Sequence, residues 1–75
     1  MPLRISEMYA FIAEDEEGEG VAAFKSSMGW MPMVGADAVR VYQLRPIAKQ
    51  VAKATGRKII LCKFTVREEM ETIEP

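Results

Sequence analysis

Two segments of the sequence, residues 8–13 and 59–64, are apolar at almost every position. Each is rich in aromatic or branched side chains and too short for a capped helix, so each predicts a β-strand. Side chains alternate between the two faces of a strand, and an apolar run therefore needs cover on both faces. This need for a layer on each side of the sheet constrains the fold more than any other feature of the chain.

The alternation assigns each apolar side chain to a face. One face carries Met8, Ala10 and Ile12 of the first strand and Ile60, Cys62 and Phe64 of the last. The opposite face carries Tyr9, Phe11, Ala13, Ile59, Leu61 and Lys63. The nearly unbroken apolar run at 59–64 predicts an interior strand.

The middle of the chain supplies the helices. Asp37 is a suitable N-cap for a short helix through Val39, Val41 and Leu44, and Pro46 predicts a kink or a second helix starting near it. Six mostly apolar residues recur at helical spacing on one face, namely Leu44, Ile47, Ala48, Val51, Ala52 and Thr55. Gly56 predicts the C-cap, and one main amphipathic helix is expected to pack on one face of the sheet.

The remaining segments predict further strands and turns. Residues 21–25 form a second strand that pairs with the first as an antiparallel hairpin across the acidic loop 14–20. Residues 30–34 predict a third strand, confined by Pro32 to an edge or a bulge. Thr65 to Glu68 match a capping box, so a short C-terminal helix is expected to place Val66, Met70 and Ile73 on one face, with a strand at 69–73 as the alternative.

The expected architecture is a single α+β domain spanning residues 1–75. It has an antiparallel or mixed sheet of about three to four strands in the order β-β-(β)-α-β. One helix covers only one face of such a sheet. The other face must be covered by the C-terminal segment, a folded loop or a second copy of the chain.

Length makes the second copy the favoured cover. A core built from 75 residues rarely supplies more than about 3–5 kcal/mol of stability without further support. The single cysteine, Cys62, forms no intramolecular disulfide, and without histidine the chain lacks the ligands of a zinc site. A homodimer is therefore expected, with the candidate contact residues Tyr9, Phe11, Trp30, Met31 and Met33.

Charge is strongly segregated along the sequence, although the formal net charge is only −1. Between residues 38 and 67 there are eight basic residues and no acidic one, whereas the flanking segments are acidic. The basic residues that best form a helix flank or lie near its end are Arg45, Lys49, Lys53, Arg57 and Lys58. They predict contact with an acidic protein partner, or alternatively with a nucleic acid.

No catalytic, cofactor-binding or metal-binding residues are expected. Histidine, the commonest proton-transfer group near neutral pH, is absent, and Cys62 lies in a predicted strand rather than in an activating environment. The N-terminal residues lack a signal-peptide pattern and no apolar run is long enough to span a membrane, so a cytoplasmic location is expected. The sequence predicts a non-enzymatic protein-binding or regulatory module, with nucleic-acid binding as the alternative.

Overall fold

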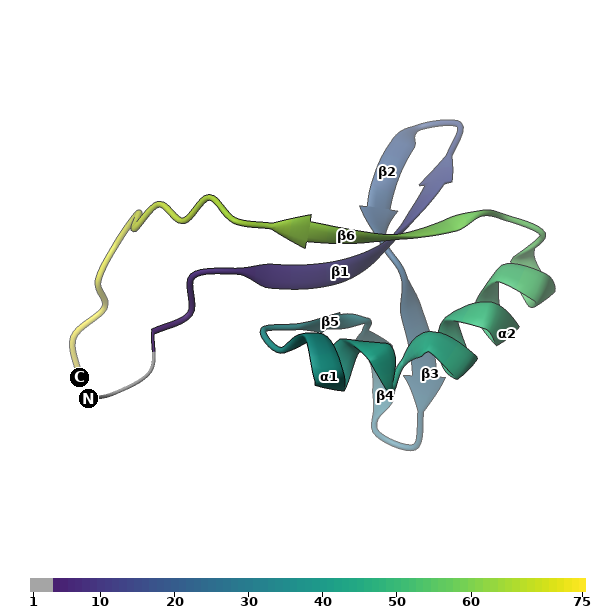
Figure 1. The fold of residues 1–75 in the computed structure, drawn as a ribbon, viewed down its shortest axis with the longest axis horizontal. Coiled ribbons are helices and arrows are strands. Elements are labelled where there is room, and N and C mark those ends of the chain that lie inside the picture. Colours follow the sequence, from purple (N-terminus) through teal and green to yellow (C-terminus); the bar gives the residue numbers. More distant parts are fainter. Residues whose placement is uncertain (1–3) are drawn as a thin grey trace.

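Two antiparallel sheets and two helices make up the computed structural model, which describes residues 4–75 (Figure 1). The elements are β1 (Met8–Asp15), β2 (Gly18–Val21), β3 (Ala23–Ser26), β4 (Gly29–Pro32), β5 (Val34–Gly35), α1 (Ala38–Tyr42), α2 (Arg45–Thr55) and β6 (Ile59–Phe64). This confirms the α+β class. Met1, Pro2 and Leu3, part of the stretch in which the sequence predicts no signal peptide, lie outside the described residues.

β1 is the central strand of the larger sheet. It pairs along one edge with β6, from Met8 opposite Phe64 to Ala13 opposite Ile59. Along its other edge it pairs first with β5 and then with β2. All of these pairings are antiparallel, as predicted for the hairpin of the first two strands. The predicted bounds of that hairpin are wrong, because most of the expected loop 14–20 belongs to β1 and β2, and only Val21 of the predicted second strand pairs with β1. β3 and β4 form a separate two-stranded sheet that contains Pro32, in keeping with its predicted edge position.

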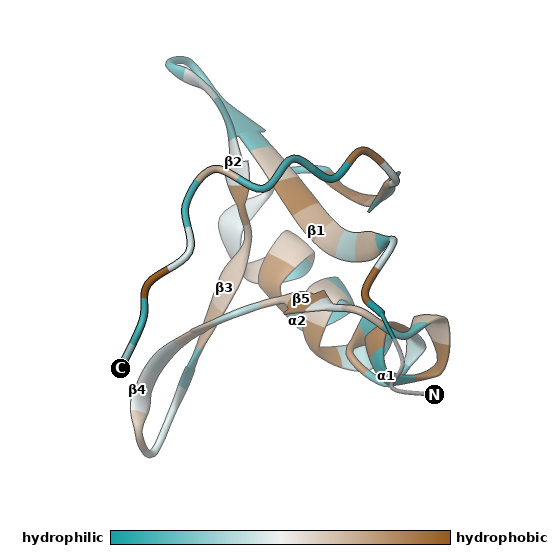
Figure 2. Cartoon of the chain, turned by 90° about the vertical axis from the view of Figure 1, so that its left-hand side faces the viewer, coloured by the Kyte–Doolittle hydropathy of each residue, from teal (hydrophilic) through white to brown (hydrophobic). Residues whose placement is uncertain are grey.

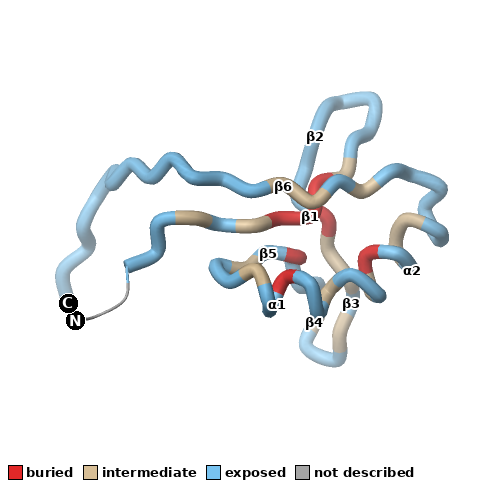
Figure 3. The backbone as a smooth tube through the Cα atoms, in the orientation of Figure 1, coloured by how far each residue is buried: buried red, intermediate tan, exposed pale blue. Residues whose placement is uncertain are grey.

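Three backbone hydrogen bonds join the two sheets at one point. The Phe11 N–H donates to the Met33 carbonyl (3.0 Å), the Ala22 N–H to the Phe11 carbonyl (2.8 Å) and the Met33 N–H to the Ala22 carbonyl (2.9 Å). Ala22 lies between β2 and β3, and Met33 lies between β4 and β5, so each predicted single strand is instead two strands with a bend. All three residues are buried and belong to the core, together with Val41 and Ala48 (Figure 3).

The helix signals of the sequence are confirmed. Asp37 caps α1, its Oδ1 accepting from the Val39 N–H at 2.8 Å. α2 starts at Arg45 with Pro46 in its first turn, and Gly56 ends it in the left-handed conformation at φ 68°. Between them, the caps fix where the chain turns back to begin β6.

Two predictions about the C-terminal part are wrong. β6 is an edge strand, since within residues 4–75 it pairs only with β1. Residues 65–75 form neither the helix nor the alternative strand. Val66, Met70 and Ile73 are all more than four-fifths exposed. A short helix gains little stability from its own hydrogen bonds, so a capping box does not order this segment without a surface to bury its apolar side chains.

No helix in the described part of the chain is long and apolar enough to cross a membrane. The longer helix, α2, has only 11 residues and carries five exposed basic or polar side chains, namely Arg45, Lys49, Gln50, Lys53 and Thr55.

Candidate functional site

The two faces of the larger sheet differ sharply in how they are covered. Phe11, Ala22 and Met33 point to one face, together with Ala13, Ile59 and Leu61, and the helices and Phe24 of β3 pack against this side. We call it the inner face. The opposite side is the outer face, and its apolar side chains are Met8, Ala10, Ile12, Val21, Val34, Ile60, Cys62 and Phe64.

No helix or strand of residues 4–75 packs over the outer face. Ala10 and Ile12 are buried in the central strand, where Ala10 lies between Val34 and Cys62 and Ile12 lies between Val21 and Ile60. Around them, Ile60 is 46% exposed, Val21 50% and Phe64 51%. In Figure 2 the brown of apolar residues runs along β1, while the turn between β1 and β2 is teal. Paired residues share a face of the sheet, so these apolar side chains form one continuous surface.

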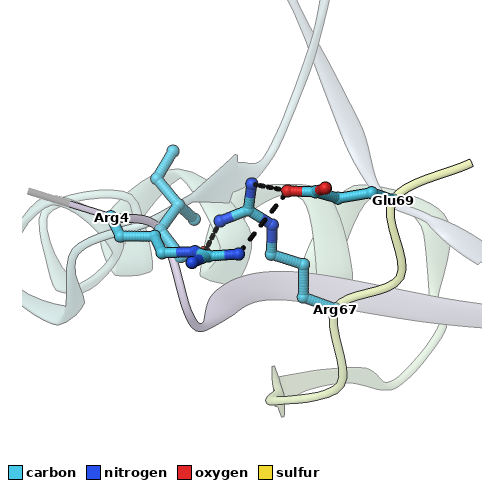
Figure 4. A network of polar contacts seen from close by, with 4 residues as sticks. Arg4, Arg67 and Glu69 are labelled. Carbon is cyan, nitrogen blue, oxygen red and sulfur yellow. Dashed lines mark hydrogen bonds and ion pairs between the residues drawn. The ribbon is translucent and has the colours of Figure 1, made fainter. Parts of the chain in front are cut away.

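A hollow of about 820 Å³ adjoins the outer face, between the segments that precede β1 and follow β6. Met8 and Phe64 belong to both the hollow and the outer face. At the far side of the hollow, Arg67 donates to the Ile5 carbonyl (3.2 Å) and to Glu69 (2.9 Å) (Figure 4). Arg4 reaches the same Glu69 oxygen at 3.5 Å, so two guanidinium groups share one carboxylate.

A polar cluster closes the inner face near the start of β1. Tyr9 and Lys63 are cross-strand neighbours, and both contact Glu7, the Tyr9 hydroxyl at 3.0 Å and the Lys63 Nζ at 3.1 Å. Hydrogen bonds from Lys63 and then Tyr9 lower the pKa of Glu7 below its ordinary value of 4.5. The same contacts to Glu7 raise the pKa of Tyr9 and of Lys63. The contacts link the start of β1 to β6 through one carboxylate.

The structure spreads the five predicted contact residues over three regions. Phe11 and Met33 need correction, because they are 4% and 0% exposed and belong to the core. The Tyr9 hydroxyl donates a hydrogen bond to Glu7. Trp30 and Met31 are exposed on β4, in the separate two-stranded sheet. The residues of the outer face were present in the sequence as the alternate positions of the two apolar strands, and that alternation is the signal that identifies them.

The five predicted basic residues divide into two groups. Arg57 lies 3.6 Å from Asp15, and Lys58 lines a shallow hollow with Glu14, Asp15 and Glu16 of the acidic hairpin. Arg45, Lys49 and Lys53 make no ion pair with any residue of the described chain from 4 to 75. The Arg45 guanidinium lies 5.8 Å from the centre of the Tyr42 ring.

Comparisons with known proteins give no further assignment. No protein-family model, no curated protein and no solved structure matches the chain. Its function is therefore inferred from the arrangement of its own residues. Among those that the structure describes, the outer face is the largest set of side chains that the fold brings together without covering it.

Proposed function

We propose that the protein is a non-enzymatic association module that forms a homodimer by packing two outer faces together. The observation that carries the proposal is the outer face itself, a continuous apolar surface over which no helix or strand of residues 4–75 packs. Two sheets stack about 10 Å apart when their apolar faces meet, which removes the exposed side chains of both from water. A second copy thus supplies the layer that the chain lacks.

The charges at the two ends of the sheet suit a two-fold axis. Glu14 and Glu19 are cross-strand neighbours at one end of the sheet, and Arg4 and Arg67 lie near the other. In a symmetric pair with antiparallel β1 strands, each acidic end lies beside the arginines of the partner. A parallel arrangement would place like charges together.

The size of the core adds to the case. Only seven hydrophobic residues are buried in the described chain, and two of these, Ala10 and Ile12, lie on the outer face. Covering a half-exposed Ile or Phe side chain contributes about 1 kcal/mol, half of the value for full burial. Several such side chains from each copy would add as much stability as a core of this size supplies alone.

Cys62 fits the same proposal. It is a free thiol on the edge strand β6, on the outer face opposite Ala10. Face-to-face packing buries it as a small apolar residue, and a reducing compartment keeps it a thiol. The cytoplasm is the location we propose for the dimer.

Sedimentation velocity at micromolar concentration tests the proposal. The unmodified chain is expected to sediment as a dimer and Ile60→Glu as a folded monomer, because a carboxylate in the packed face would lose its hydration. Phe64→Ser provides a second variant of the same surface. Val39→Glu is the matched control, since Val39 is also apolar and exposed but lies on α1, away from the outer face.

Circular dichroism checks that each variant is folded. An unmodified chain that stays monomeric, or a folded Ile60→Glu and a folded Phe64→Ser that both stay dimeric, would overturn the proposal.

Nucleic-acid binding remains the alternative, and one observation favours it: Arg45, Lys49 and Lys53 have no acidic partner among residues 4–75. Against it, Arg57 and Lys58 lie beside the acidic hairpin, which repels phosphate. Titration with mixed DNA and RNA at low salt would show binding that Lys49→Glu with Lys53→Glu weakens if this alternative holds.

A further inference from the structure

A groove runs between α2 and β6 on the inner side of the sheet. Its volume is about 240 Å³. The floor is apolar, with Phe11 from β1 and Ile59 and Leu61 from β6. Arg45, Ala48, Lys49 and Ala52 of α2 complete the lining.

The groove exists because α2 presents small side chains to β6. Ala48 and Ala52 face the strand, and neither is long enough to fill the space above Ile59 and Leu61. Arg45 and Lys49 lie on the same side of the helix, at the i and i+4 positions, so two positive charges border an apolar floor. The sequence predicts these two residues on a helix flank, and the structure places them beside the groove.

One segment of the chain has the complementary chemistry. Residues 65–75 expose Val66, Met70 and Ile73, each more than 80% accessible. Their spacing puts them on one face of a helix, and the other positions include Glu68, Glu69, Glu71 and Glu74. The segment is thus an acidic amphipathic helix in sequence that has no surface against which to fold.

We propose that the groove between α2 and β6 binds this acidic segment from a second copy of the chain. Met70 and Ile73 occupy the apolar floor, and the glutamates face Arg45 and Lys49. The segment becomes helical as its apolar side is buried, in the way amphipathic helices dock in apolar grooves. This interaction uses the inner side of the sheet and does not depend on the outer-face dimer.

The contacts around Glu69 determine that the segment comes from another copy. Arg4 and Arg67 hold Glu69 beside Ile5, and Figure 1 shows the chain after β6 leading away from α2. In Figure 1 residues 65–75 run to the end of the molecule opposite α2. While those contacts hold, the segment therefore lies away from the groove of its own chain.

A fluorescent peptide of residues 65–75 tests the proposal when it is titrated with the full chain and followed by anisotropy. Measurement on Ile60→Glu removes outer-face association, so failure of the dimer proposal and failure of the groove proposal are read separately. We expect saturable binding that weakens with salt, because it includes exposed charge pairs. Replacing Met70 and Ile73 of the peptide by Ser should abolish it.

Two substitutions in the protein locate the binding site. Ala52→Trp fills the groove and should abolish binding, whereas Ala54→Trp, on an exposed position of the same helix, should not. Lys49→Glu should raise the Kd about tenfold, equivalent to about 1.4 kcal/mol. Lys25→Glu, an exposed lysine on β3, is its control.

Several outcomes would overturn the proposal. One is the absence of peptide binding, whether or not RNA binds the same lysines. Another is binding that Ala52→Trp and Lys49→Glu leave unchanged. A third is binding found with the unmodified chain and lost in folded Ile60→Glu, which would assign the segment to the outer face. The last outcome concerns the unlabelled chain. If circular dichroism shows that residues 65–75 are helical to the same extent at every protein concentration, the segment binds the groove of its own copy.

Discussion

The inner and outer faces of the larger sheet are built from the same two strands and are almost equally apolar. They differ in what lies against them. On the inner face Phe11 is 4% exposed, covered by the helices and by the bends at Ala22 and Met33. On the outer face Phe64 is 51% exposed, with no element over it. Apolar side chains therefore do not by themselves identify the core, which also needs elements packed over them. The inner face has such elements, and the outer face is the surface that we propose for association.

A matched pair of truncations offers the strongest way to break this comparison. Phe11→Ala should lower the free energy of unfolding by about 3–5 kcal/mol, which is most of what so short a chain has. Phe64→Ala, measured at dilution in the monomer, should cost less than about 1.5 kcal/mol, because half of that side chain is already in water. Urea unfolding followed by circular dichroism measures both, and similar losses would contradict the distinction.

Two glycines beside β1 give a smaller test of how tightly the inner side is packed. A Cβ on Gly35 would meet Val41 Cγ2 at 2.7 Å, and Val41 is buried, so Gly35→Ala should cost about 1–3 kcal/mol. Gly20 has no atom within 4 Å of the same position. Gly20→Ala should therefore change the stability by less than about 0.5 kcal/mol in the same unfolding experiment.

The reactivity of Cys62 reports on the outer face directly. If the thiol reacts only in the monomer, the observed rate of its reaction with a thiol reagent is proportional to the fraction of monomer. When about a tenth of the chain is monomeric, the rate should be about tenfold lower than that of the fully monomeric chain. Ile60→Glu should react at one fast rate at every protein concentration. A rate for the unmodified chain that does not change with concentration would mean that Cys62 stays uncovered.

The smallest effect concerns the polar end of the inner face. Lys63 and Tyr9 depress the pKa of Glu7, so their contribution to stability is present above the unfolded-state pKa and is lost as the pH falls through the lower folded-state value. Lys63→Met should raise the pKa of Glu7 toward 4.5 in a carboxyl NMR titration. Lys53→Met, which removes a charge that does not contact Glu7, should leave that pKa where it is.

Much of the fold could be predicted from local signals. The Asp37 cap, the Pro46 start and the Gly56 end of α2 depend on neighbouring residues only, and the structure has all three. The bend at Ala22 carries no such signal and the bend at Met33 has only the preceding Pro32, because each bend depends on hydrogen bonds to residues at least 11 positions away. The edge position of β6 was missed for a similar reason, since an apolar run indicates side chains that need cover and not whether they have it.

The candidate site was only partly predictable. Alternation placed Met8, Ile60 and Phe64 on one face, and the structure leaves these three half-exposed. Phe11 and Met33 were predicted as contact residues because aromatic residues and methionine are enriched at interfaces, and both lie in the core. The groove could not be predicted, because its width depends on how α2 packs beside β6 and its floor includes Phe11 of β1, which is distant from both in sequence.

The ring of backbone bonds among Phe11, Ala22 and Met33 also bears on how the chain is made. The three residues are spaced 11 positions apart in the sequence. Phe11 and Ala22 each lack one of their hydrogen-bond partners in the ring until Met33 has been added. A nascent polypeptide that has not yet extended beyond residue 33 lacks this closure, so we expect it to leave the ribosome without a lasting tertiary structure and to fold in a single late step.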